Sequence, residues 1–212
     1  FAYKIFKKYF NNLFYNMHIF LIFFASFLMI ALSIASKLEL GWDAKYFNHT
    51  KALFFFEGLN ISEIKNFQDY NWHPHFGSYI WAFFWKLPFI NIEYFGRLFY
   101  AFIFCFSLST IIFSCIKKNY LSFIIFFTTL ILIYNYKIFS GLQEVLIFSL
   151  LIISSKYLNE SKIGKNDVNV FVLLLIMNIL IWIKSEGIIF SITLMFILIL
   201  NDELSFKKKI FI

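Results

Sequence analysis

Charged residues are scarce in this 212-residue sequence, and arginine is almost absent. Asp, Glu, Lys and Arg make up 15% of the chain, apolar residues make up 61%, and the mean hydropathy is +0.75. Soluble globular domains carry about 25% charged residues, so the composition excludes an ordinary soluble domain and indicates an integral membrane protein. Arg97 is the only arginine among nineteen basic residues. In a chain that otherwise uses lysine, it is expected where a planar, bidentate donor is needed.

Cysteine, proline and glycine are also rare, with two, two and seven residues. Cys105 and Cys115 are ten positions apart on one expected helix, roughly 15 Å along its axis, so they cannot form a disulfide with each other. Their spacing does not match a cysteine metal site. The few prolines and glycines give no sign of the paired broken helices of many transporters. The sequence also lacks a glycine-rich loop of the P-loop or dinucleotide-binding kind.

Apolar runs dominate the rest of the chain. Those long enough, or nearly so, to cross a hydrocarbon core of about 30 Å are 17–35, 95–116, 120–136, 142–158, 168–183 and 187–200. We therefore expect an all-α fold, a polytopic transmembrane helix bundle that forms a single domain over 1–212. Its expected parts are a first span at 17–35, a large outer loop with interfacial helices at 37–96, and about five further spans over 95–200. Because the chain begins at Phe1 and 207–212 look like the entrance to another span, we expect a fragment.

The run 77–90 is apolar but interrupted by Lys86 and Pro88, and the side assigned to every later turn depends on whether it crosses. Short loops rich in lysine face the cytoplasm. If the run lies at the outer interface, with Trp81 and Trp85 as aromatic anchors, the inner segments hold eleven lysines against four acids, and the outer segments hold eight basic and eight acidic residues. If it crosses, the lysine clusters fall outside. We therefore expect an interfacial helix here.

The segment 41–75 is the longest polar interval. It contains three of the four histidines and four acids, namely His49, His73, His75, Asp43, Glu57, Glu63 and Asp69. A helix is expected over 43–56, with a stop at Gly58. We expect the segment to be an outward-facing loop that carries an active site. Under the same topology, the turns 137–144 and 184–187 face outward with it.

The acids and the arginine each have a structural and a chemical interpretation. Asp43 can cap the helix that it begins, a contribution of about 1 kcal/mol. It can also act as a general base, partly desolvated between Trp42 and the following aromatic residues. Arg97 can extend toward lipid headgroups or hold the phosphate of a lipid substrate through paired N–H donors. Glu144 can complement a helix N-terminus or serve as a second acid or metal ligand.

The histidines and the turn 184–187 leave alternatives open as well. Pro74 holds its neighbour extended, so His73 and His75 can project to the same side. They can be polar loop residues at the headgroups or contacts to a phosphate or pyrophosphate, and a metal site would need further ligands. Lys184 and Glu186 can neutralise each other in a tight turn.

The order of these features resembles the GT-C glycosyltransferases, and among them the protein O-mannosyltransferase-like and aminoarabinose-transferase-like enzymes, which use polyprenyl-phosphate sugars. The shared features are a first span with its N-terminus inside, an outer loop that opens with Trp42-Asp43, Tyr46 three residues on, a His-Pro element before an aromatic helix, an arginine at the next span and an acid one hairpin later. The likeness covers about 17–200 and depends on order and spacing.

The resemblance also implies roles for single residues. The positions that match the family are Asp43 for its catalytic acid, His73-Pro74 for the start of its His-Pro-Pro element, Arg97 for its arginine, Glu144 for its second outer acid, and 184–187 for a Lys-x-Glu-Gly turn of bacterial members. Two positions depart from the family. His75 replaces the second proline, and Ala44 follows where many members have a second acid, which disfavours a two-carboxylate metal site there.

The resemblance implies an inverting glycosyltransferase of the bacterial inner membrane with an active site facing the periplasm. It would move a hexose or pentose from a polyprenyl-phosphate carrier to a glycan, lipid or protein acceptor. The expected site comprises Asp43 as catalytic base, Tyr46, His73, His75, Arg97 and Lys184 as substrate or phosphate ligands, and Glu144 and Glu186 as second acids. A divalent metal held by Asp43 and Glu144 stays open, and no nucleic acid is expected as a partner.

Two other classes of protein stay open from the sequence. One is a transporter or flippase for a lipid-linked sugar, which would need ionisable groups at mid-bilayer depth, whereas the expected spans carry charges almost only at their ends. The other is a non-catalytic or polymerase-type membrane protein of polysaccharide assembly. A scaffold would tolerate changes at Asp43 and Arg97, and an enzyme would not.

Overall fold

The computed structural model describes residues 17–37, 39–64, 66, 74–87, 91–115, 119–135, 139–163 and 167–200. All regular elements in these residues are helices, which confirms the expected all-α class. Two helical stretches, Ile19–Lys37 and Tyr94–Phe113, are long and apolar enough to cross a membrane, although a buried core helix or a signal sequence can share these properties. The apolar helices at Tyr120–Leu132, Val168–Ile183 and Gly187–Ile199 are shorter.

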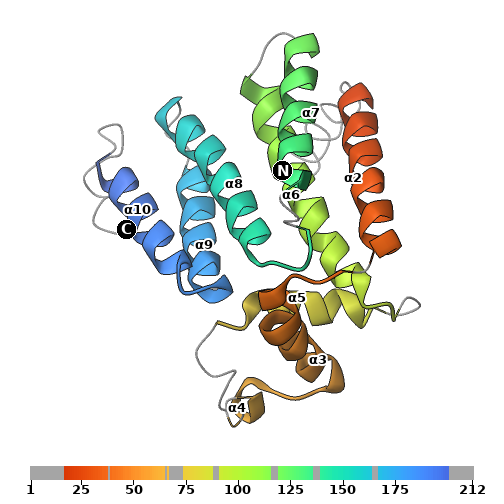
Figure 1. Cartoon of the computed structure of the whole chain (residues 1–212). Helices are drawn as coiled ribbons and strands as arrows, with labels where there is room; N and C mark the ends of the chain where they lie inside the picture. Colours follow the sequence, from red (N-terminus) through yellow and green to blue (C-terminus); the bar gives the residue numbers. More distant parts are fainter. Residues whose placement is uncertain are drawn as a thin grey trace, which may run out of the picture.

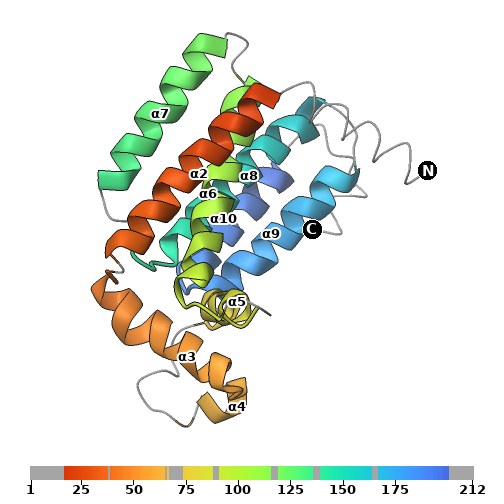
Figure 2. The same ribbon diagram turned by 90° about the vertical axis from the view of Figure 1, so that its right-hand side faces the viewer.

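One helix, α6, lies at the centre of the bundle. The helices of the bundle are α2 (Met17–Lys37), α6 (Tyr94–Cys115), α7 (Asn119–Asn135), α8 (Glu144–Ile163), α9 (Asp167–Ile183) and α10 (Gly187–Ile199). Helix α6 packs against α2 and α8, α9 packs on α8, and α10 packs on α9. Helix α7 contacts α6 and stands at the edge of the bundle (Figure 2). The buried face of α6, with Tyr100, Ala101, Phe104 and Cys105, forms much of the core.

Short helices cover one end of this bundle (Figure 1). They are the π-helix η1 (Ala44–His49), α3 (Thr50–Glu57), α4 (Ile61–Ile64) and α5 (Phe76–Trp85). Helix α5 has 10 residues, about 15 Å, which is half of a 30 Å hydrocarbon core. Trp81, expected as an aromatic anchor at the interface, is instead fully buried, and its ring packs against that of Tyr100 on α6. The Tyr100 hydroxyl also donates to Gly77 O at 2.7 Å, which fixes α5 to α6. Helix α3 packs on α5.

The helix expected over 43–56 is present, with one difference. Residues 42–43 and α3 are α-helical, but η1 between them is a π-helix. The chain leaves α3 at Gly58, whose φ of +97° lies in the left-handed region. A glycine adopts this conformation at no steric cost, which explains why the helix ends there. The expected stop at Gly58 is therefore confirmed.

Candidate active site

Three segments that are far apart in the sequence meet at the covered end of the bundle. Just before η1, the backbone N–H of Gly41 donates to Ser140 O at 2.9 Å. In the turn after α9, Lys184 Nζ lies 2.5 Å from Glu144 Oε1 in the first turn of α8. The start of η1, the turn before α8 and the turn after α9 therefore lie together.

A buried amide, Gln143, joins these segments to α5. Its side chain is 4% exposed. In the amide orientation that pairs donors with acceptors, Nε2 donates to Ile183 O at 2.6 Å and Oε1 accepts from the Ser78 hydroxyl at 3.1 Å. Asn48 of η1 adds a hydrogen bond from Nδ2 to Gly141 O at 3.4 Å. This role of Gln143 has no local signal in the sequence, because the burial of a glutamine at a helix start depends on its distant partners.

Asp43 lies at the start of η1 on the surface. Its side chain is exposed, and it makes no capping hydrogen bond to the helix. The expected cap is therefore wrong, and so is the expected desolvation by neighbouring aromatic rings. Trp42 and Tyr46 lie beside it with 68% and 50% of their surface exposed, and their ring centroids are 5.2 Å apart. The Asp43 carboxylate is thus accessible to a substrate in solution.

Lys184 connects two of the expected acids. Its Nζ lies 2.5 Å from Glu144 Oε1 and 3.5 Å from Glu186 Oε1, and the lysine side chain is 25% exposed. Partial burial alone would lower the pKa of Lys184, but the hydrogen bond and charge of Glu144, with those of Glu186, outweigh it and raise that pKa. Lys184 is therefore a fixed, partly accessible cation at neutral pH, and Glu144 is already neutralised by it.

Arg97 is buried inside the protein. It is 2% exposed. Its Nη2 lies 2.9 Å from Glu93 Oε2, and its Nη1 donates to Glu39 O at 3.1 Å, in the segment that follows α2. The bidentate donor expected from its uniqueness is thus used to connect parts of the chain. This geometry assigns Arg97 a positioning role, because a lipid phosphate outside the protein does not reach a guanidinium at this depth.

The histidines of the polar segment have different surroundings. His73 lies outside the described residues, and so does the prediction that it projects to the same side as His75. His75 is half-buried at the start of α5, with its ring 6.2 Å from that of Phe55. His49 lies between Trp81 and Trp85, at 5.7 Å from each ring centroid.

Two titratable residues of this region, His49 and Lys51, were assigned no role from the sequence. Burial lowers the pKa of His49, an effect that the charge of Glu93 opposes and that of Arg97 reinforces. Lys51 of α3 is only 1% exposed, and burial lowers its pKa to about 8. The burial of Lys51 depends on the packing of α3 over α5. In the sequence it therefore has the ordinary features of an exposed helix lysine.

The metal site that the sequence left open, at Asp43 and Glu144, finds no support in the described residues. Among them, no group of three or more His, Cys, Asp or Glu side chains lies close enough to hold a metal ion. Of the two residues expected as ligands, Asp43 is exposed and Glu144 is paired with Lys184. The described ionisable side chains of this end include these carboxylates and Lys184.

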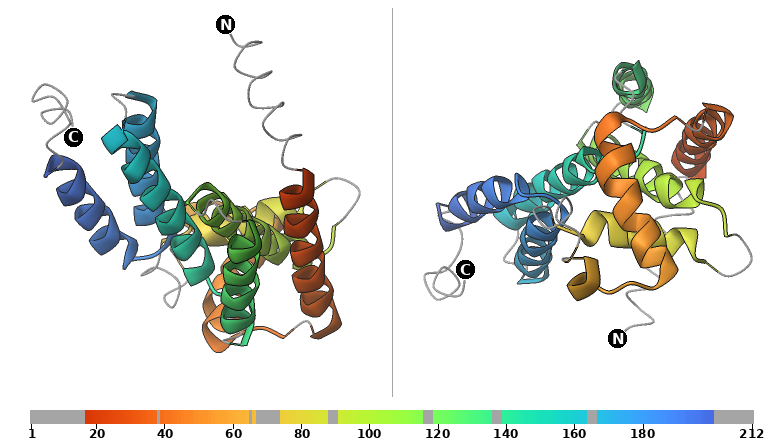
Figure 3. Two further views of the ribbon diagram at one scale, coloured as in Figure 1. Left: turned by 90° about the horizontal axis from the view of Figure 1, so that it is seen from above. Right: turned by 60° about the horizontal axis from the view of Figure 1, so that its bottom comes forward.

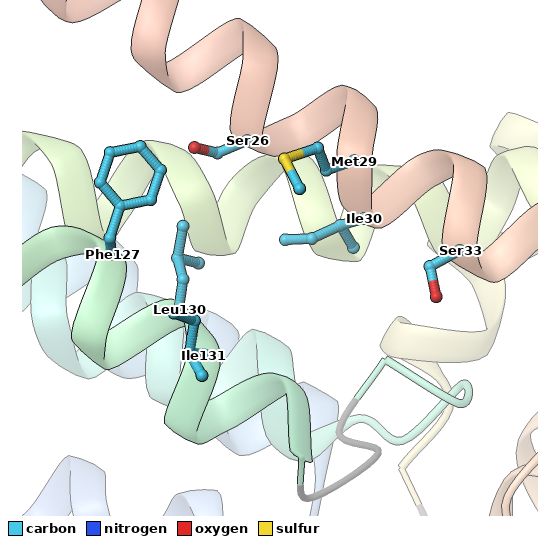
Figure 4. A pocket seen from close by; sticks show the side chains of 7 residues that line it. All are labelled: Ser26, Met29, Ile30, Ser33, Phe127, Leu130 and Ile131. Carbon is cyan, nitrogen blue, oxygen red and sulfur yellow. The ribbon is translucent and has the colours of Figure 1, made fainter.

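An apolar groove lies away from this end, between α2 and α7 (Figure 4). It has a volume of about 360 Å³ and is lined by Ser26, Met29, Ile30, Ser33, Phe127, Leu130 and Ile131. None of these side chains is ionisable, so the groove cannot supply an acid or a base. It has the character of a surface that faces lipid chains.

Comparison of the chain with protein-family models, with curated proteins and with solved structures finds no match. The residues and their geometry are therefore the basis for a functional assignment.

Proposed function

We propose that this chain is a membrane glycosyltransferase of the GT-C type, which transfers a sugar from a polyprenyl-phosphate carrier to an acceptor hydroxyl. One observation carries the proposal. An exposed aspartate that does not cap its own helix, Asp43, shares one end of a helical bundle with a fixed cation, Lys184. A base and a cation at one surface are the groups that transfer from a phosphate leaving group requires.

The apolar surface of the bundle supports a place in the membrane. On α2, Met29 and Leu32 are each 70% exposed, and on α10 Ile189 is 66% exposed. A soluble protein rarely exposes large contiguous apolar patches, whereas lipid chains cover them at no cost. We propose a polytopic bundle with α3 and α5 at the outer interface, in the bacterial inner membrane, so that the site faces the periplasm.

In the proposed reaction, Asp43 removes the proton from the acceptor hydroxyl while that oxygen attacks the anomeric carbon of the donor sugar. The bond between this carbon and the carrier phosphate oxygen breaks, and its electron pair leaves with the polyprenyl phosphate. Lys184, whose ammonium is held between Glu144 and Glu186, donates a hydrogen bond to the departing phosphate. A single displacement inverts the anomeric centre.

The other residues of this end hold these groups in place. Glu144 and Glu186 fix the Lys184 ammonium, and Gln143 holds the turn before α8 against α5 and the end of α9. Arg97 fixes the segment after α2, from which η1 begins. Positioning of this kind supplies a large part of the rate enhancement in enzymes.

Replacement of the base tests the proposal. Asp43→Asn keeps the size of the side chain but removes its proton affinity, so we expect a loss of transfer of at least about 100-fold. The assay would use the full chain in membrane vesicles with radiolabelled mannose and glucose on undecaprenyl phosphate, and would measure transfer to acceptors extracted from the same membranes.

Glu57→Gln is the matched control, since Glu57 is an exposed carboxylate at the other end of the same helical segment. We expect it to retain full transfer. An Asp43→Asn protein that stays in the membrane with full activity would remove the base assignment. Flipping of the same lipid by both proteins, without transfer, would instead identify a transporter. The described parts of α2, α7, α9 and α10 carry no Asp, Glu, Lys or Arg between their ends, which favours the enzyme.

A further inference from the structure

We propose that the side chains of Trp42 and Tyr46 form a stacking platform for a pyranose ring of the acceptor, so that the acceptor is a carbohydrate. This inference rests on the proposed transferase activity, because it assigns the substrate that meets Asp43. The two rings are referred to below as the aromatic platform.

The exposure of the platform is the first observation. Trp42 is 68% exposed and Tyr46 50%, and their ring centroids are 5.2 Å apart with an angle of 47° between the planes. Buried aromatic rings contribute the large apolar areas of protein cores. Two adjacent rings that stay open on the polar end of a protein therefore have surface available for a ligand.

The platform is also held in place. The ring of Phe47 meets that of Trp42 edge-on at 5.8 Å, and Lys45 Nζ lies 5.8 Å from the centroid of Tyr46. The backbone N–H of Gly41, one residue before Trp42, donates a hydrogen bond to Ser140 O. A pre-organised surface loses less conformational entropy when a ligand binds.

The surrounding groups fit a sugar ring. One face of a pyranose presents C–H groups, whose hydrogens carry partial positive charge and are attracted to the negative face of an aromatic ring. The hydroxyls at the rim of the sugar need hydrogen-bond partners. Asp43, which follows Trp42 in the sequence and is exposed, supplies acceptor oxygens, and the exposed Lys45 supplies donors.

The same position favours the acceptor over the donor. A general base must lie within hydrogen-bond distance of the hydroxyl that it deprotonates, so groups that flank Asp43 contact the molecule that carries this hydroxyl. The donor phosphate instead requires a cation, and the expected one is Lys184, in a different turn.

An aromatic anchor in the headgroup region is the competing role for exposed tryptophans of membrane proteins. Two features favour the sugar. Trp42 is flanked by the exposed Asp43 and lies next to the turn before α8, and the segment from η1 to α3 crosses the end of the bundle (Figure 3, right). Trp182 on α9 is also exposed, by 59%, but it lies among the apolar residues of its helix and serves as the comparison.

Direct binding tests the platform without any transfer. Saturation-transfer NMR would use the full chain in phosphatidylglycerol-containing nanodiscs with methyl α-mannopyranoside or methyl β-glucopyranoside, and no donor. We expect magnetisation to reach the C–H protons of one sugar face. Trp42→Leu should abolish this magnetisation transfer, Trp42→Tyr should retain most of it, and Trp182→Leu should leave it unchanged.

Kinetics provide the second measurement. Trp42→Leu should raise KM for a sugar acceptor about tenfold, as expected for the loss of one stacking contact, with KM for the donor unchanged. Transfer with normal acceptor KM in Trp42→Leu would overturn the platform and leave the transferase intact. Sugar binding that depends on Trp42 without any transfer would overturn the transferase and leave the platform. If the wild-type protein and Trp42→Leu bind the sugar equally, or if neither binds it, the platform is overturned and Trp42 is identified as a headgroup anchor. If Trp42→Leu does not fold, Tyr46→Leu and Trp42→Tyr decide by the same two measurements.

Discussion

At the scale of single residues, Arg97 connects the site to the bundle. Its guanidinium pairs with Glu93 and with the carbonyl of Glu39 while being 2% exposed. A buried ion pair contributes little net stability, but removal of one partner leaves the other charge buried and uncompensated. In the proposed enzyme Arg97 therefore acts indirectly, by holding the segment after α2 in place.

Arg97→Met is expected to lower the free energy of unfolding by about 3 kcal/mol, because the partly buried Glu93 carboxylate loses its partner. The double variant with Glu93→Gln should recover much of this loss, since the uncompensated charge is removed. Thermal unfolding in detergent micelles measures both effects. A different result, in which Arg97→Lys has wild-type stability and a much higher KM for the donor, would assign Arg97 to the lipid phosphate.

The sequence marks Arg97 as unusual but does not show what it binds. A lone arginine among lysines indicates a need for a rigid donor, and that need is real. Whether the acceptor is a lipid phosphate or a carbonyl of the same chain depends on burial, which arises when α6 packs beside the segment after α2. For Asp43, its place at the start of a helical segment was predictable, but its exposure and its missing cap bond were not.

At the scale of helices, the close approach of α5 to α6 decides how firmly the end of the bundle is covered. A Cβ on Gly96 would overlap Trp81 Cδ1 and lie 2.6 Å from Trp81 O. Only a glycine lets α6 approach the α5 backbone so closely, and Trp81 is thereby buried against Tyr100.

Gly96→Ala should therefore separate α5 from α6 and lower the free energy of unfolding by roughly 2–3 kcal/mol. Gly58→Ala is the contrast, since a Cβ there meets nothing within 4 Å and only the positive φ is unfavourable, at a cost of about 1 kcal/mol. Thermal unfolding of the two variants measures the difference. Equal stabilities would show that α5 adjusts freely over α6.

The helices themselves were largely predictable from the apolar runs. The apolar runs coincide with the helices α2, α6, α7, α8, α9 and α10 to within a few residues at most ends, and two of these helices, α2 and α6, are long and apolar enough to cross a membrane. Composition and capping signals act locally, so they determine where helices begin and end. The π-helical winding of η1 was not predictable, because it depends on how Gly41 and Asn48 meet the turn before α8.

At the scale of the whole molecule, the charge distribution along the sequence and the packing of the helices both favour an arrangement in which the turns with the expected site residues lie at one end of the bundle. The turn before α8 and the turn after α9 lie at the end that α3 and α5 cover (Figure 1). The expected alternation of the helices predicted that these turns would lie at one end of the bundle. Their direct contact through Lys184 and Gln143 could not be read from the sequence, because it depends on which helices are neighbours.

Labelling of single cysteines tests this arrangement in the membrane. In a full chain with Cys105 and Cys115 replaced by serine, cysteines at positions 43, 86 and 186 should react with an impermeant maleimide added outside. A cysteine at position 159, near the other end of α8, should react only after permeabilisation. Labelling of positions 43 and 186 from opposite sides would contradict both the bundle orientation and the shared site.

The π-helical winding of η1 makes helical pitch itself a determinant of where Asp43 points. Relative to an α-helix, residues 44–49 take one more residue per turn, which rotates the preceding turn by roughly 100° about the axis. The buried face of α3, with Lys51 and Ala52, follows this segment. Loss of a single residue between 44 and 49 is therefore expected to turn the Asp43 carboxylate to another side of the helix axis relative to α3.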